Sequence, residues 1–160
     1  LCTVRLTEVN ELQREETGQW EKNEREVYTG QWMLCELNRE FPTWLTIWPR
    51  ERMDKLFGSK TIRTGNETFD KRFNVSSDDE AAALHILTPD RAEKILALAD
   101  SSFGKFAINL NRDGRLYLAV HSGHGFFDLG KGREDPALLR QRFTRELTWF
   151  TNMIDVFRGA

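Results

Sequence analysis

The side chains best suited to chemistry in this sequence are His121 and His124, the only two histidines close together, with Asp128 four residues further on. Imidazole nitrogens and carboxylate oxygens bind zinc, and a catalytic zinc site takes three protein ligands and leaves one position open for water. Asp78 or Asp79 is an alternative source of the carboxylate. If these groups converge, the protein is a small metal-dependent hydrolase.

The same spacing also fits two solvated histidines in a loop. A motif this short is weakly specific, and catalytic zinc needs ligands held on rigid elements with an outer shell of hydrogen bonds, whereas residues 122–132 are rich in glycine. One observation separates the two interpretations, because only the enzyme requires both histidines to converge on a carboxylate in a concave pocket.

The acidic run at residues 78–80 has a structural explanation. Ser77 and Glu80 have the spacing of a capping box, in which the serine oxygen accepts a first-turn amide hydrogen and the glutamate reaches back. Asp78 and Asp79 would then lie at a helix N-terminus, where the helix dipole stabilises carboxylates. We therefore predict a helix start here, since consecutive carboxylates on a helix point in different directions rather than at one metal ion.

The sequence shows neither an activated nucleophile nor a phosphate-binding loop. Ser122 is a sequence neighbour of histidine, but no Gly-x-Ser-x-Gly turn surrounds it. The glycines of residues 123–132 lack the Gly-Lys-Ser/Thr ending that places a lysine on a nucleotide phosphate. We therefore predict no catalytic residue and no cofactor.

The candidate binding residues are aromatic or basic. Residues 14–26 are polar, and we interpret them as a long hairpin loop that carries one tryptophan. Several arginines gather near the start of the last predicted helix, where they suit an anionic lipid headgroup, although Glu134, Asp135 and Glu146 dilute the positive potential. The candidate ligand-binding residues are Trp20, Arg133, Arg140, Arg142 and Arg145.

Composition bounds the class of protein. The 160 residues fit one domain, and a net charge of -2 gives no reason to expect nucleic acid, whose binders carry clustered Lys and Arg. Cys2 and Cys35 are too few for a disulfide framework or a zinc cluster, which indicates a reducing, cytoplasmic setting. The sequence starts at Leu1 without a methionine, so that we expect a fragment of a longer protein with a membrane anchor in the missing N-terminal part.

Alternating apolar residues predict an antiparallel sheet. Residues 27–37 carry apolar side chains on both faces, which is typical of a strand covered at least in part on both sides. Residues 111–114 read Asn-Arg-Asp-Gly and predict a tight hairpin turn. The predicted strands are residues 3–9, 27–37, 44–48, 60–63, 73–76, 105–110 and 115–120.

Helical signals lie between the strands and after them. We predict a short helix at residues 50–57, a helix that starts after Ser77, and another from Thr88 and Pro89. Asp135 and Pro136 start a long amphipathic helix whose apolar residues recur at steps of three and four. The predicted class is α+β, with a bent antiparallel sheet of about six to seven strands, inserted short helices and a long C-terminal helix, an arrangement similar to a pleckstrin-homology roll.

The order of several apolar motifs resembles a known family. These motifs are residues 28–32 with Phe41, the Ile-Trp-Pro at residues 47–49, the run 69–89, and the Leu-Tyr-Leu-Ala-Val at residues 116–120. Together they resemble the bacterial family catalogued as domain of unknown function 3137. The resemblance implies a soluble domain that follows membrane-spanning segments, and it brings no established activity and no catalytic residues.

The predicted function is therefore a non-catalytic binding module on the cytoplasmic side of a membrane-anchored bacterial protein. Its partner would be a protein, a peptide or a lipid headgroup. Its candidate surfaces are the loop around Trp20, the loop 123–132 and the basic start of the last helix. The alternative is the metal-dependent hydrolase that uses His121 and His124.

Overall fold

The described part of the chain folds into a six-stranded antiparallel sheet with four helices. A computed structural model describes residues 1–13, 20–50, 61–129 and 135–159, without the side chains of residues 10–13, 20 and 21. The strand order is β1-β2-β6-β5-β3-β4, and each neighbouring pair is antiparallel. The elements are β1 (Cys2–Gln13), β2 (Trp20–Glu36), β3 (Leu45–Pro49), α1 (Glu67–Arg72), β4 (Phe73–Ser76), α2 (Glu80–Ile86), α3 (Pro89–Asp100), β5 (Lys105–Leu110), β6 (Arg115–His121) and α4 (Pro136–Arg158). The α+β class, the bent open sheet and the long C-terminal helix are confirmed.

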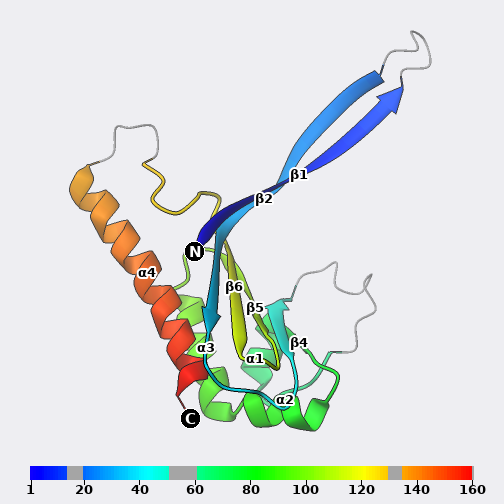
Figure 1. Ribbon diagram of the computed structural model, residues 1–160, viewed down its shortest axis with the longest axis vertical. Coiled ribbons are helices and arrows are strands. Elements are labelled where there is room, and N and C mark those ends of the chain that lie inside the picture. The colour runs from blue at the N-terminus through cyan, green and yellow to red at the C-terminus, as the bar shows by residue number, and fades with distance from the viewer. Residues whose placement is uncertain (14–19, 51–60, 130–134, 160) are drawn as a thin grey trace.

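The core lies between one face of the sheet and the helices. In β5 and β6 every second residue is buried, as expected for strands with one covered face. The long helix α4 crosses this face (Figure 1) and buries Trp149, Phe150 and Met153. Trp149 also donates a hydrogen bond from Nε1 to the carbonyl of Leu98 in α3, 2.9 Å away. We call the face covered by α3 and α4 the inner face, and the opposite one the outer face.

Strands β1 and β2 extend far beyond the rest of the sheet. They pair with each other from Cys2↔Trp32 to Gln13↔Trp20, whereas β2 pairs with β6 only between Gln31 and Glu36. The remaining part, residues 4–13 and 20–30, projects away from the core as a two-stranded ribbon (Figure 1). We call this ribbon the arm.

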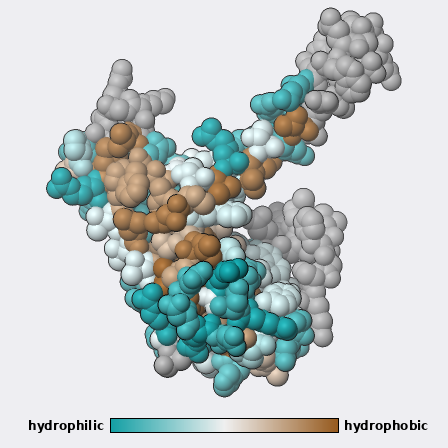
Figure 2. All heavy atoms as spheres, in the orientation of Figure 1, coloured by the Kyte–Doolittle hydropathy of each residue, from teal (hydrophilic) through white to brown (hydrophobic). Residues whose placement is uncertain are grey.

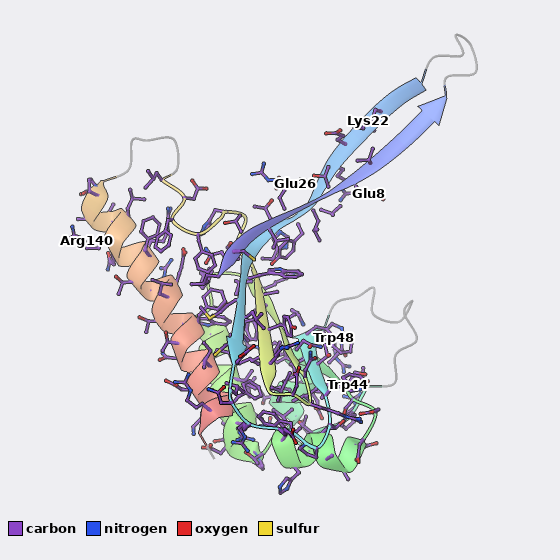
Figure 3. The ribbon with its side chains drawn as sticks, in the orientation of Figure 1. Glu8, Lys22, Glu26, Trp44, Trp48 and Arg140 are labelled. Carbon is purple, nitrogen blue, oxygen red and sulfur yellow. The ribbon has the colours of Figure 1, made fainter. Side chains whose placement is uncertain are left out.

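The arm corrects the prediction that residues 14–26 form a loop. Residues 20–26 belong to β2, so that Trp20 begins a strand rather than lying in a loop. Charged residues do not prevent a ribbon of this kind, because its backbone bonds are made across the pair and opposite charges attract across it. Arg5 Nε lies 3.1 Å from Glu26 Oε2, for example. Figure 3 shows the charged side chains of Glu8, Lys22 and Glu26 along the arm.

Two local predictions between β3 and β4 need correction or lie outside the described residues. The helix predicted at 50–57 falls in a segment that is not described. No strand forms at residues 61–63, although the amide of Ile62 donates to Val75 O at 2.8 Å. Helix α1 was not predicted, and its cap is Asn66, whose Oδ1 accepts a hydrogen bond from Phe69 N at 3.1 Å.

The predicted helix start near Ser77 is two residues too early. Asp79 is the N-cap of α2, with Oδ1 2.9 Å from Ala82 N, while Ser77 Oγ donates to the carbonyl of Trp44 at 2.6 Å. The side chain of Ser77 therefore links the loop before α2 to the backbone just before β3 and does not cap the helix. The predicted starts of α3 at Thr88 and of α4 at Asp135 are confirmed, since each side chain accepts a first-turn amide hydrogen.

Candidate functional site

The three predicted zinc ligands lie in different surroundings. His121 ends β6 and is exposed, with its ring 4.9 Å from the ring of Tyr28. His124 turns toward the core, and Asp128 is exposed. Among the side chains that the structure describes, no group of three or more His, Cys, Asp or Glu residues could hold a metal ion. The described residues therefore contain no metal centre built from these three side chains.

The acids considered as further ligands are used elsewhere. Asp78 accepts a hydrogen bond from Thr43 Oγ1, and its Oδ2 lies 2.5 Å from the guanidinium of Arg112. The bond from Thr43, followed by the charge of Arg112, lowers the pKa of Asp78. Asp79 caps α2. Both carboxylates therefore have structural partners at the end of the sheet where α2 begins.

His124 belongs to a buried polar cluster that the sequence did not reveal. Its Nε2 lies 3.6 Å from Glu146 Oε1, and its Nδ1 lies 3.4 Å from Gln31 Nε2. Gln31 Nε2 donates to Glu146 Oε2 at 2.8 Å. Gln31 and Glu146 are almost completely buried, although Gln31 lies in β2 and Glu146 in α4. We call Thr29, Gln31, His124, Arg142 and Glu146 the polar cluster.

The polar cluster fastens the loop after β6 to the rest of the fold. Three buried oxygen atoms, Thr29 Oγ1, Gln31 Oε1 and Glu146 Oε1, have no hydrogen-bond partner within the described part of the chain. Unpaired buried oxygens are uncommon and are typically satisfied by ordered water. The amide of Gly123 donates to Thr29 O at 3.0 Å, which holds the same loop on β2. The cluster therefore positions a loop, and it contains no hydroxyl or thiol activated as a nucleophile.

The predicted basic residues do not form one patch. Arg133 lies outside the described residues. Arg140 and Arg145 are exposed, and Figure 3 shows Arg140 on the side of α4 away from the sheet. Arg142 instead points inward, where it donates to the carbonyl of Asp128 and its Cζ lies 5.2 Å from the ring centre of Phe143. The side chain of Trp20 is not described.

The outer face of the sheet carries an apolar hollow of about 510 Å³. The register places its residues in two rows across the strands. One row is Trp32, Ala119 and Ala107, and the other is Leu34, Tyr117, Asn109 and Thr46. Small alanines form the floor, while the larger side chains of β2 stand beside it.

Trp32 and Leu34 are the most exposed large residues that β2 contributes to this hollow, at 40% and 52% of their full accessible surface. The prediction that residues 27–37 are covered at least in part on both sides is therefore not met around Trp32 and Leu34, where no element of the described chain covers the outer face. Trp32 Nε1 donates to the hydroxyl of Tyr28 at 3.0 Å, and Tyr28 donates to Val120 O at 3.1 Å. Burial is the main cause that raises the pKa of Tyr28. This chain of hydrogen bonds fixes the indole at the rim of the hollow.

A second apolar surface lies on the N-terminal half of α4. Phe127, Leu129 and Leu138 are all more than half exposed. A shallow hollow of about 370 Å³ runs beside Leu139, Phe143 and Leu147. Figure 2 shows apolar residues gathered over this half of the helix and the loop before it.

None of the helices in the described ranges combines the length and apolar character needed to cross a membrane.

No curated protein and no solved structure matches the chain, so that the likeness to a pleckstrin-homology roll stays a prediction. Residues 26–158 match the family described as protein of unknown function DUF3137, a range that runs from within β2 to the end of α4 and includes the polar cluster and the outer hollow except Leu1 and Cys2. The chain belongs to the DUF3137 family.

Proposed function

We propose that this domain is a non-catalytic protein-interaction module whose outer face binds the outer face of a second copy. The apolar hollow beside Trp32 and Leu34 carries the proposal. A membrane anchor outside this sequence stays a prediction that rests on the family resemblance, and a cytoplasmic location stays one that rests also on the low cysteine content.

The first support is that this face does not have the composition of a solvated one. An antiparallel sheet with one free face usually alternates apolar side chains inside with polar side chains outside. Here tryptophan, leucine, tyrosine and two alanines point outward in the middle of the sheet. Contiguous exposed apolar surface of this kind is typical of an interaction site.

The second support is the absence of charge at the hollow. No charged side chain is among its described lining residues, and the polar ones are neutral, such as Asn109 and Thr46. Interface centres are depleted of charge in the same way, because an unpaired charge is costly to remove from water. A lipid headgroup would need cationic lining residues, so that a protein surface is the better match.

The third support is self-complementary shape. A two-fold dimer uses the same patch on both copies, so that one patch must offer both a projection and a recess. Trp32 and Leu34 form the projection, and the recess lies over Ala107 and Ala119. The apolar surface also continues along the arm, because Leu6 stands opposite Tyr28 on the same face and is about half exposed.

Oligomeric state tests the proposal directly. Sedimentation velocity across a wide range of concentrations should show wild-type protein passing from monomer to dimer. Leu34→Glu should weaken the dimer at least about tenfold, or about 1.4 kcal/mol, because each copy would bury an unpaired carboxylate. Circular dichroism should be unchanged, since Leu34 is on the surface.

The matched control is Leu138→Glu, which places the same charge at a similarly exposed leucine on α4. It should dimerise like the wild type. A wild-type protein that stays monomeric, or equal effects of the two substitutions, would contradict self-association through the outer face. If the protein stays monomeric and its outer face binds a different protein, that protein is the partner, and the proposal of a second copy is wrong.

A further inference from the structure

A separate hollow of about 350 Å³ lies on the helix side of the molecule, next to Arg91 of α3 and Gly159 at the end of α4. Figure 1 shows that α4 ends beside α3. Three basic side chains line it, those of Arg39, His85 and Arg91. Phe41 and Pro42 provide apolar walls. Neither the charge pattern of the sequence nor the interaction module proposed above assigns a role to this site.

Arg91 is a buried cation that forms no ion pair among the described residues, although the charge of the neighbouring Asp90 acts on it. It is only 8% exposed, and it donates to the carbonyls of Ile86, Val156 and Gly159 at 2.6, 3.1 and 3.0 Å. These carbonyls at the ends of α2 and α4 use three of its five N–H donors, and they carry no net charge. Burial and then the charge of Arg39 lower the pKa of Arg91.

Arg39 adds a second positive charge to the same hollow. It is exposed, and its Cζ lies 4.8 Å from the ring centre of Phe41. Within the described ranges no carboxylate pairs with either arginine, and the one acid in the wall, Asp90, lies 2.7 Å from Lys94. Two cations that share a recess repel each other, and a bound anion would offset that repulsion.

We propose that this hollow binds the phosphate group of a small organic phosphate. A guanidinium matches phosphate geometry with two parallel hydrogen bonds, and two guanidinium groups suit its double charge. Thr88, the N-cap of α3, also lines the hollow, where the N-terminus of this helix adds partial positive charge. The remaining space beside Phe41, Pro42 and Ile86 accommodates the carbon skeleton.

The phosphate group has two sources with the same chemistry, a soluble phosphate ester or a phospholipid headgroup. Glycerol 3-phosphate represents the first, and phosphatidylcholine vesicles that contain phosphatidic acid represent the second. Calorimetric titration with glycerol 3-phosphate and cosedimentation with these vesicles, at constant ionic strength, distinguish them. Binding in either assay that depends on Arg39 supports the site and identifies the source.

The decisive variant is Arg39→Gln, because Arg39 is exposed and makes no bond on which the fold depends. It should lose at least about tenfold in affinity, equal to about 1.4 kcal/mol. Arg145→Gln removes one positive charge from an exposed position on α4, outside the hollow, and should bind like the wild type. Arg91→Gln would also remove donors from three carbonyls, so that a weaker fold is expected and the variant is not decisive.

Amide chemical shifts provide a second readout. On titration they should change at Arg39, His85 and Thr88, and not along β6. Equal affinity of wild type and Arg39→Gln would overturn the proposal, and so would a failure of the wild type to bind both glycerol 3-phosphate and the vesicles. Loss of the site would leave dimerisation through the outer face unaffected, since the two surfaces share no residue.

Discussion

Gln31 and Glu146 are 115 positions apart in the chain, yet their side chains form a buried hydrogen bond of 2.8 Å. The bond joins β2 to α4 at the place where the arm leaves the sheet. Burial makes the two partners interdependent, because a buried carboxylate that loses its donor keeps the full cost of leaving water.

We therefore expect Gln31→Leu to lower the free energy of unfolding by about 1–3 kcal/mol. The substitution keeps a side chain of similar size but removes the donor to Glu146 Oε2. Urea denaturation followed by tryptophan fluorescence measures the change.

The double variant Gln31→Leu/Glu146→Leu is the control for this effect. Apolar pairs often replace buried polar pairs at little cost, so that the double variant should be more stable than the sum of the two single effects implies. If the two effects simply add, the hydrogen bond does not couple these residues.

At the level of single residues the sequence identified His124 but not its role. Glu146 was treated only as a charge that dilutes the basic cluster, although one signal was present. It lies three residues after Phe143 and four before Phe150, so that it interrupts the apolar stripe of the helix. A carboxylate at such a position predicts a buried polar partner. The identity of that partner depends on β2, which helical periodicity does not show.

At the scale of elements, the joint between the arm and the sheet depends on Gly30. A Cβ added to Gly30 would lie 2.1 Å from the carbonyl oxygen of Val120 and 2.6 Å from the hydroxyl of Tyr28. Strand β2 therefore approaches β6 more closely than any other residue type allows at this position.

Gly30→Ala should destabilise the protein by about 1–3 kcal/mol, the usual cost of overpacking a rigid site. Thermal unfolding followed by circular dichroism measures the loss. Gly159→Ala is the comparison, because its added methyl meets nothing nearer than 3.4 Å and should have little effect. Similar melting temperatures for the two variants would show that β2 can move away from Val120.

Elements with strong periodicity were predicted well, and those governed by tertiary pairing were not. The starts of α3 and α4 and the hairpin at residues 111–114 have local signals that the structure bears out. The predicted strand at residues 3–9 lies in β1, whereas residues 20–26 of the arm have no apolar alternation to detect, since their pairing is imposed by the register that β1 and β2 share at their base. The sequence did not predict the outer hollow, for a different reason. The two-sided apolar pattern of residues 27–37 was visible, but only the assembled sheet shows that nothing in the described chain covers one side.

At the scale of the whole molecule, we expect the stability of the core to be largely independent of the arm. The arm side chains of residues 7–9 and 22–27 are exposed and contribute nothing to the buried core, which lies between the sheet and the helices. Two-stranded ribbons without a covering layer are also marginally stable by themselves.

Replacing residues 9–24 by Asn-Gly should therefore leave the melting temperature within a few degrees of the wild type. The deletion closes the ribbon after the paired residues Glu8 and Arg25 with a turn type suited to a hairpin. Differential scanning calorimetry measures the melting temperature. Dimerisation should persist, since Trp32 and Leu34 are retained, whereas a loss of about 1 kcal/mol or more would show that the arm supports the core.

The position of the core residues in α4 also bears on how the protein is made. Phe150, Met153 and Phe157 are completely buried, and they come near the end of the sequence. While the ribosome is still adding them, the inner face of the sheet lacks the part of its cover that α4 provides, although α3 has already been made. This domain therefore cannot finish folding until residue 157 has left the exit tunnel, and until then the part of the sheet that α4 covers is exposed to chaperones and to neighbouring chains.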